Sequence, residues 1–383
     1  MKNFDNIRPL EGNEVPEAMQ RLLNEKQFID AAAIALPGVS AEELHAVMSS
    51  CKTIPDFQKK LVKPFLFGLA ERTTSGVSLD VTHFKNQPAT FISNHRDIIL
   101  DAAFFNIYLF DKGYDTTEIA IGDNLLIHPW IKDLVRVNRS FIVERGVSTR
   151  QMLEVSSHLS AYIHHVIGEK KHSVWIAQRE GRAKDSNDRT QESLLKMLNL
   201  GRKGRFLENI IALNITPLSI SYEYDPCDYL KAAEFQLKRD NPDYKKQGAD
   251  DLLNMRTGLL GFKGKAHFYI GKSINEQLKK LPADWDKKTQ ITATGNIIDS
   301  EIHKNYCIYS VNYIALDMLE KENRFSNQYT EEEKQAFETY LEKQLEKITI
   351  PNKDNNFLKN KILEMYSNPL KNKINAESEA IGY

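Results

Sequence analysis

The sequence has few cysteines and no long apolar run, and each of these features argues against certain classes of protein. Its three cysteines, Cys51, Cys227 and Cys307, are far apart and lack the CxxC spacing of a structural zinc site. An odd, scattered set also argues against a disulfide framework and suits a reducing cytosol. No segment approaches the ~18–20 apolar residues of a membrane span, and residues 1–19 do not resemble a signal peptide. We therefore expect a cytoplasmic protein without a metal site.

The chain also lacks an excess of charge of either sign. Its 51 Lys and Arg side chains nearly balance 52 Asp and Glu side chains, which gives a formal net charge of −1. There is no overall positive field to attract nucleic acid, so any anion site must be a local cluster of cations. Hydrophobic residues make up 41% of the 383 residues, enough for one large domain with appendages or two modest domains.

The order of the predicted elements indicates an α/β fold. The first ~85 residues have a helical pattern, in which Ser40 and Glu43 predict a capping box. Six β-rich runs then alternate with helical stretches. They lie at residues 89–93, 117–122, 140–144, 173–178, 210–222 and 265–271. Strands separated by helices favour a mostly parallel central sheet flanked by helices.

The expected organisation has three parts: a helical leader (1–85), an α/β domain (86–275) and a helical C-terminal region (276–383). In the last part, long helices are predicted at 289–322 and 330–346. The tail after residue 355 is expected to end in a weakly structured stretch rich in Lys and Asn.

A histidine follows the first β-rich run. His95 and Asp97 lie between the end of that run and an apolar helical pattern that contains Asp101. Polar loops at the carboxyl ends of parallel strands are where α/β folds place reactive groups. His95 could act as a general base, with Asp97 or Asp101 orienting its ring and stabilising the imidazolium. The competing interpretation is that Asp97 only caps the helix.

Three later segments place cations or a proline beside β-rich runs. Arg145 follows one run, residues 177–185 place Arg182 and Lys184 beside Gly181, and Pro217 interrupts a third run. Glycine lets backbone N–H groups approach an anion, and arginine can bind phosphate through two hydrogen bonds. Taken singly, the charges could be a solvated face and the proline an edge-strand or bulge residue.

In this order, the segments resemble the four motif blocks of the glycerolipid acyltransferase superfamily, which includes lysophosphatidic acid and glycerol-3-phosphate acyltransferases. Asn94-His95 with a following Asp is similar to the histidine–aspartate block, and residues 140–145 are similar to the second. Residues 176–184, with Glu180-Gly181, resemble the third, and residues 216–223, centred on Pro217, resemble the fourth. The blocks lie between about residues 90 and 225, and the helical tail is typical of a longer bacterial branch.

The resemblance implies a direct acyl transfer without a cofactor or a metal. His95 would take a proton from an acceptor hydroxyl as that hydroxyl attacks an acyl thioester of coenzyme A or acyl carrier protein. The acceptor implied is glycerol phosphate or lysophosphatidic acid. The implied substrate-binding residues are Arg145, Glu180, Gly181, Arg182, Lys184 and Pro217.

This chain departs from the family pattern at two places. Five residues separate His95 from Asp101, where four are usual, although some relatives show five, so Asp101 is favoured over Asp97. On an ideal helix an offset of six residues is ~120° away, so Asp101 can reach the ring only if His95 lies in the preceding loop. Arg179 stands where the third block usually has proline, which leaves the choice between Arg182 and Lys184 as phosphate ligand open.

Other functions fit less well. A GxSxG nucleophile motif is absent, and the glycine-rich residues 258–265 have the wrong spacing for a P-loop. His164 and His165 lie in a helical pattern and are expected to be surface residues rather than metal ligands. Two alternatives stay open: an N-acyltransferase of aminolipids, and a catalytically silent lipid- or anion-binding protein on the same scaffold.

A lipid acceptor implies a membrane surface as a partner. We expect peripheral association with the cytoplasmic face through one of two stretches that combine lysines with bulky apolar residues, 59–67 and 357–363. The second, in the tail, is favoured, because Phe65 and Phe67 of the first could instead pack the leader onto the α/β core.

Overall fold

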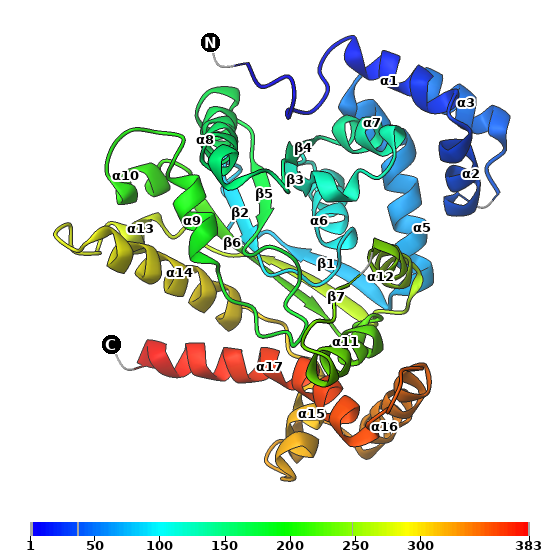
Figure 1. Ribbon diagram of the computed structural model, residues 1–383, viewed down its shortest axis with the longest axis vertical. Coiled ribbons are helices and arrows are strands. Elements are labelled where there is room, and N and C mark those ends of the chain that lie inside the picture. Colours follow the sequence, from blue (N-terminus) through cyan, green and yellow to red (C-terminus); the bar gives the residue numbers. More distant parts are fainter. Residues whose placement is uncertain (1–2, 37, 247, 382–383) are drawn as a thin grey trace.

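The computed structural model describes residues 3–36, 38–246 and 248–381, and a seven-stranded sheet lies at its centre (Figure 1). The strands are β1 (Gly76–Asp80), β2 (Thr90–Ser93), β3 (Glu118–Gly122), β4 (Ser140–Val143), β5 (Val174–Ala177), β6 (Ile215–Tyr222) and β7 (Lys265–Ile270). Their order across the sheet is β1-β7-β6-β2-β5-β3-β4. Every neighbouring pair is parallel except β6 and β7. The predicted α/β fold with a mostly parallel sheet is confirmed.

Each of the six predicted β-rich runs contains a strand, and the differences are local. The run predicted at 210–222 begins inside helix α10 (Phe206–Ile211). Asn214, with a φ of 47°, turns the chain so that β6 starts only at Ile215. The leader, expected to be helical up to residue 85, also contributes β1, which pairs with β7 at the edge of the sheet.

Helices cover both faces of the sheet (Figure 1). One face is covered by α8 (Thr149–His165), α9 (Glu192–Leu198), α10, α13 (Asn275–Leu278) and α14 (Lys287–Lys304). The other face is covered by α5 (Lys63–Thr73) and α6 (Leu100–Asp111). Successive strand residues point to opposite faces, so Phe91 joins the second core and Ile92 the first.

The leader helices form a separate small core. They are α1 (Glu14–Leu23), α2 (Lys26–Ala35), α3 (Ala41–Ser49) and α4 (Ile54–Phe57), and they pack with α7 (Pro129–Val137). The predicted capping box of Ser40 and Glu43 starts α3. Pro64 does not break the following helical stretch. It lies near the start of α5, which continues directly from the π-helical turn η1 (Gln58–Val62), and the wider π turn accommodates a residue that cannot donate a backbone hydrogen bond.

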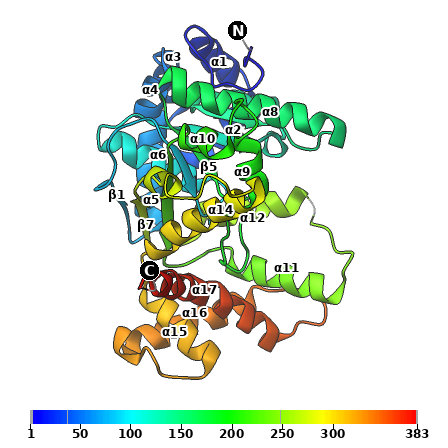
Figure 2. The same cartoon turned by 90° about the vertical axis from the view of Figure 1, so that its left-hand side faces the viewer.

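The C-terminal region is helical almost to its end. Helices α15 (Ser310–Glu320), α16 (Glu331–Glu346) and α17 (Asn355–Ile381) pack with α11 (Asp228–Asp240) around a core of their own, below the sheet in Figures 1 and 2. The helix predicted at 289–322 is two helices, α14 and α15. The weakly structured end expected after residue 355 is wrong, because α17 buries an apolar stripe against α15, α11 and α14.

The stretches expected to meet a membrane are largely packed inside the protein. Leu358 and Ile362 of α17 are 0% exposed, so the expectation that the apolar residues of the tail enter a lipid surface is wrong. In the leader, Leu66 is buried, and Phe65 and Phe67 pack against the core beneath α5. Within the described residues, no helix combines the length and the apolarity that a bilayer span needs.

One further helix and three short helical turns complete the described chain. They are α12 (Gly248–Leu260), η2 (Asp123–Leu125), η3 (Val166–Lys170) and η4 (Ser326–Gln328). The division of the chain at residues 85 and 275 stays a prediction.

Candidate active site

His95 lies in the loop between β2 and α6, and Asp101 lies in the first turn of α6. The Nδ1 atom of His95 is 2.8 Å from Asp101 Oδ2. The Asp101 side chain is 1% exposed and that of His95 is 13% exposed. The same carboxylate oxygen accepts hydrogen bonds from the backbone N–H groups of Arg96, at 2.6 Å, and Asp97, at 3.1 Å. This contact holds the imidazole through Nδ1 and leaves Nε2 to exchange a proton with a substrate.

Asp97, the second candidate partner of His95, instead caps α6. Its Oδ1 accepts hydrogen bonds from the backbone N–H groups of Ile99, at 2.9 Å, and Leu100, at 2.8 Å. A Cβ added to Gly258 of α12 would lie 2.1 Å from Asp97 Oδ2, so that glycine makes room for the carboxylate. Burial raises the pKa of Asp97, and the nearby Asp101 carboxylate raises it further.

Two neighbours of His95 anchor its loop. The Asn94 side chain donates to the backbone carbonyl of Ile220 on β6 and accepts from its N–H, both at 2.8 Å. Arg96 forms an ion pair with Asp188 at 2.9 Å, with side chains only 8% and 0% exposed. A buried pair of this kind is strongly destabilised when one partner is removed. The sequence analysis missed the role of Asp188, because that residue lies beyond the third motif block and nothing local links it to Arg96.

His95 lines a largely apolar cavity of about 590 Å³. The Trp175 ring of β5, which also lines this cavity, stands edge-on to the imidazole with ring centroids 6.1 Å apart. Other residues of the wall come from α6, α7, α8, α9 and β3. They include Ala102, Ala103, Ile119, Ile121, Leu134, Val135, Leu159, Leu194 and Met197. The size and the lining suit a long apolar ligand.

His95 also lines an adjoining basic cavity of about 570 Å³. Six cationic side chains line it: Arg145, Arg179, Arg182, Lys184, Lys231 and Lys246. Four carboxylates also line it: Glu180, Asp185, Glu234 and Asp251. The cavity therefore carries an excess of positive charge although the whole chain is nearly neutral. Its chemistry suits an anionic ligand.

The structure brings the second and third motif blocks together. Arg145 Nη1 donates to Glu180 Oε1 at 2.9 Å, and both side chains line the basic cavity. Gly181 follows with a φ of 65°, a left-handed conformation that favours glycine. These three residues thus lie beside His95, as the resemblance implied, and their roles in binding stay predictions.

The two candidate phosphate ligands of the third block have different surroundings. Lys184 pairs with Glu234 of α11, which also pairs with Lys238 at 2.9 Å. Arg182 donates to Asn254 Oδ1 at 3.0 Å and, in the described part of the chain, has no carboxylate ion-pair partner. Arg182 is therefore the better placed of the two to receive an added anion.

Pro217 is buried in the interior of the sheet and lines neither cavity. It lies opposite Ile92 of β2, and pairing with β7 begins one residue later, at Leu218. The Pro217 carbonyl still accepts a hydrogen bond from the Gly271 N–H at 2.9 Å. The edge-strand interpretation is wrong, and the substrate-binding role of Pro217 stays a prediction.

Part of this chain is similar to a known protein family. A family model described as Acyltransferase matches residues 77–212, which include β2, His95, Asp101, Arg145 and the third motif block. Residues 77–212 are thus similar to an acyltransferase domain, in agreement with the motif blocks of the sequence. The family match supports an acyltransferase activity.

The matched acyltransferase domain ends before β6, so the fourth block and the whole C-terminal region lie outside it. None of the curated proteins matches the chain. Among solved structures, the chain is similar to the 1-acyl-sn-glycerophosphate (LPA) acyltransferase PlsC from Thermotoga maritima. Identity is 13%, the alignment covers 70% of this chain and 98% of that one, and the TM-score is 0.30.

Proposed function

We propose that this acyltransferase moves a fatty acyl group from a thioester of coenzyme A or acyl carrier protein to a hydroxyl of glycerol phosphate or lysophosphatidic acid. The observation that carries the proposal is that His95 lines both the apolar and the basic cavity. An acyl chain in the first and a phosphate in the second would bring a thioester carbonyl and an acceptor hydroxyl together at the imidazole.

In the proposed reaction His95 is the general base. Its Nε2 accepts the proton of the acceptor hydroxyl while the oxygen attacks the carbonyl carbon of the thioester. The buried Asp101 carboxylate stabilises the imidazolium that results. The C–S bond then breaks, and the thiol leaves with the proton that His95 returns. The products are an ester and a free thiol, without a covalent acyl-enzyme.

The function is tested by a screen of the purified protein. Acyl-CoA and acyl carrier protein donors are offered with glycerol-3-phosphate, lysophosphatidic acid, unphosphorylated glycerol or an aminolipid, and release of free thiol is followed. We expect release only with a phosphorylated acceptor. Faster release with the aminolipid would favour N-acylation, and no release with any acceptor would favour a binding protein.

The phosphate-binding role is expected to be concentrated in Arg182. Arg182→Ala removes a charge-assisted contact, which corresponds to about 1.5–3 kcal/mol, or roughly 10- to 150-fold in kcat/KM for the acceptor. Arg145→Ala should have a smaller effect, because Arg145 is 37% exposed and already shares its charge with Glu180. Steady-state kinetics with acceptor and donor varied separately measure both losses.

The exposed Arg202→Ala in the loop before α10 is the matched control and should leave both constants unchanged. Equal losses for donor and acceptor in Arg182→Ala would mean that Arg182 binds the phosphates of the carrier or only supports the fold.

Peripheral membrane binding is proposed at the mouth of the apolar cavity. Ile99, Ile127 and Leu252 line this cavity and are nevertheless 38%, 51% and 48% exposed. The adjacent Leu253 of α12 is 47% exposed, and the cations Lys245 and Arg256 beside it are exposed. Apolar side chains at the rim could enter a lipid surface while the cations meet anionic headgroups.

The double substitution Leu252→Ser/Leu253→Ser should lower binding to anionic vesicles at least fivefold in sedimentation at low salt. Each leucine contributes on the order of 1 kcal/mol when partly inserted. Ile34→Ser on α2 is the matched control, because Ile34 is 81% exposed and lines neither cavity. Binding of the wild type should weaken as salt rises. Vesicle binding that is unaffected by the double substitution would exclude this rim as the contact surface.

A further inference from the structure

The C-terminal helix α17 contacts both loops that surround Arg182, although it lies far outside the matched acyltransferase residues. The first is the loop after β5, residues 178–191, which carries Arg182 itself. Asn368 Nδ2 donates to the backbone carbonyl of Asp185 in this loop at 2.7 Å. One turn further along α17, Asn372 Oδ1 accepts from Arg189 Nη2 at 3.3 Å.

The second loop follows β6 and leads into α11. Tyr366 of α17 accepts a hydrogen bond from the Asp225 N–H at 3.0 Å and donates one to Asp228 Oδ2 at 2.9 Å. Tyr340 of α16 donates to the same oxygen at 2.6 Å. Tyr366 is 4% exposed and Asp228 is 0% exposed, so these hydrogen bonds are shielded from water.

The β6–α11 loop lies close to the Arg182 side chain, because Cys227 Sγ donates to the Asn254 carbonyl at 3.3 Å and Arg182 donates to the Asn254 side chain at 3.0 Å. Burial by itself lowers the pKa of the guanidinium, but Cys227 and the carboxylates of Asp225 and Asp97 raise it above its usual range. The environment therefore keeps Arg182 charged. Its position depends on two loops, and the same helix holds each of them by a separate hydrogen bond.

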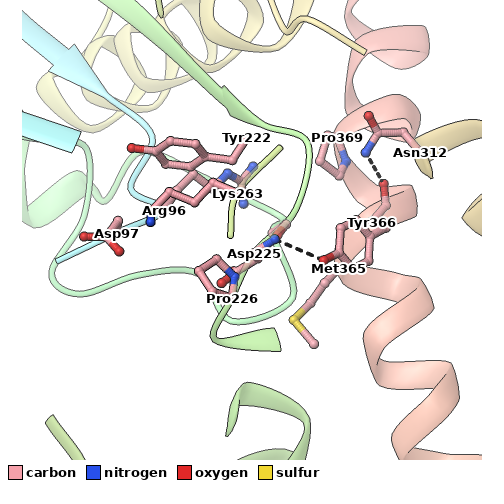
Figure 3. Close-up of a pocket in the computed structure, with 11 residues that line it drawn as sticks. Arg96, Asp97, Tyr222, Asp225, Pro226, Lys263, Asn312, Met365, Tyr366 and Pro369 are labelled. Carbon is pink, nitrogen blue, oxygen red and sulfur yellow. Dashed lines mark hydrogen bonds between the residues drawn. The ribbon is translucent and has the colours of Figure 1, made fainter. Parts of the chain in front are cut away.

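A small cavity of about 40 Å³ marks where the tail meets the active-site loops (Figure 3). Arg96, Asp97 and Asp225 line it from the α/β side, and Tyr366 and Pro369 line it from α17. Arg96 and Asp97 directly follow His95 in the chain. The tail thus lies against the base of the histidine loop and is not a separate appendage.

We propose that α17 is a positioning element for the acceptor site, in which Asn368 and Tyr366 hold the two loops that place Arg182. The inference rests on the proposed role of Arg182 in binding the acceptor phosphate. It assigns a function to the C-terminal region, and it predicts that residues outside the motif blocks set the affinity for the acceptor.

The test uses Asn368→Ala, Tyr366→Phe and their combination in the full-length enzyme. Asn368→Ala removes the hydrogen bond to the Asp185 carbonyl, and Tyr366→Phe removes both the bond accepted from the Asp225 N–H and the bond donated to Asp228. Neither substitution removes much apolar volume. We expect each to raise the KM for lysophosphatidic acid about three- to tenfold, with the KM for acyl-CoA changed less than twofold. Asn360→Ala, on an exposed position of the same helix, is the matched control and should behave as wild type.

A merely structural role is distinguished by repeating the substitutions in an Arg182→Ala background. If α17 acts through Arg182, adding both Asn368→Ala and Tyr366→Phe to the Arg182→Ala enzyme should change its KM for lysophosphatidic acid less than twofold. The same loss in both backgrounds, or equal losses for donor and acceptor, overturns the proposal. So does a thermal midpoint that falls while the acceptor KM at 25 °C stays unchanged.

The two hypotheses fail in different ways. An Arg182→Ala enzyme with an unchanged acceptor KM would refute the phosphate-binding role on which the inference rests. An Arg182→Ala enzyme with a raised acceptor KM, together with silent α17 substitutions, would refute the positioning role of α17 alone.

Discussion

Replacing His95 by alanine is expected to lower kcat by roughly 10²–10⁴-fold, the range that a general base contributes. The loss should fall on kcat rather than on either KM, because both cavities that His95 lines keep their other walls. The fold should survive, since the His95 side chain lies in a loop and the anchors of that loop, Asn94 and Arg96, are retained. Thioester turnover with saturating donor and acceptor measures the effect.

His45→Ala on α3 serves as the control, because this histidine is exposed and lies in the leader. It should leave the rate unchanged. A purified and folded His95→Ala enzyme that retains more than about a tenth of the wild-type rate would show that His95 is not the base.

Asp101→Asn is expected to have the second-largest effect, roughly 10²–10⁴-fold in kcat. The amide keeps the volume and can still accept from the Arg96 and Asp97 N–H groups, but it loses the charge that stabilises the imidazolium. A comparable change in a catalytic triad costs about 10⁴-fold. Turnover of the purified variant is compared with its thermal midpoint, which should change little because the backbone contacts are kept.

Asp97→Asn is the matched control, with the same chemical change four residues earlier. Because Asp97 Oδ1 caps α6, an asparagine can preserve the cap, and we expect less than a tenfold loss. A larger loss for Asp97→Asn than for Asp101→Asn would reverse the assignment of the orienting carboxylate.

Much of the site could be predicted because its signals are local. A polar loop between a strand and a helix contains His95, and an apolar strand precedes each cationic block. In a parallel sheet the strands end at the same edge, so residues that follow β2, β4 and β5 meet in space although the chain separates them. That rule alone brings His95, Arg145 and Arg182 to one place.

The distant partners could not be predicted. Asp188 neutralises Arg96, and Glu234 neutralises Lys184 from α11, 50 residues away in the chain. Among the described side chains, no carboxylate forms an ion pair with Arg182, which makes it the better phosphate candidate of the two. Such pairings depend on how elements pack, and charge patterns along the chain do not record them.

The fold of the C-terminal tail also could not be predicted from the sequence. Its Lys- and Asn-rich composition predicted a weakly structured, membrane-seeking end, whereas α17 buries Leu358 and Ile362 in a core shared with α11, α15 and α16. A helix of modest intrinsic propensity is stabilised mainly by tertiary packing, so composition was a poor guide.

The sequence by itself determined the α/β alternation, the position of the histidine loop and the similarity to an acyltransferase domain, because hydrophobic periodicity and short motifs are recorded within a few neighbouring residues. The tertiary structure alone decided that Asp101 rather than Asp97 meets the ring and that α17 lies against the active-site loops. The physical reason is that hydrogen bonds and buried ion pairs form between atoms that are close in space, and only the packed fold fixes which atoms those are.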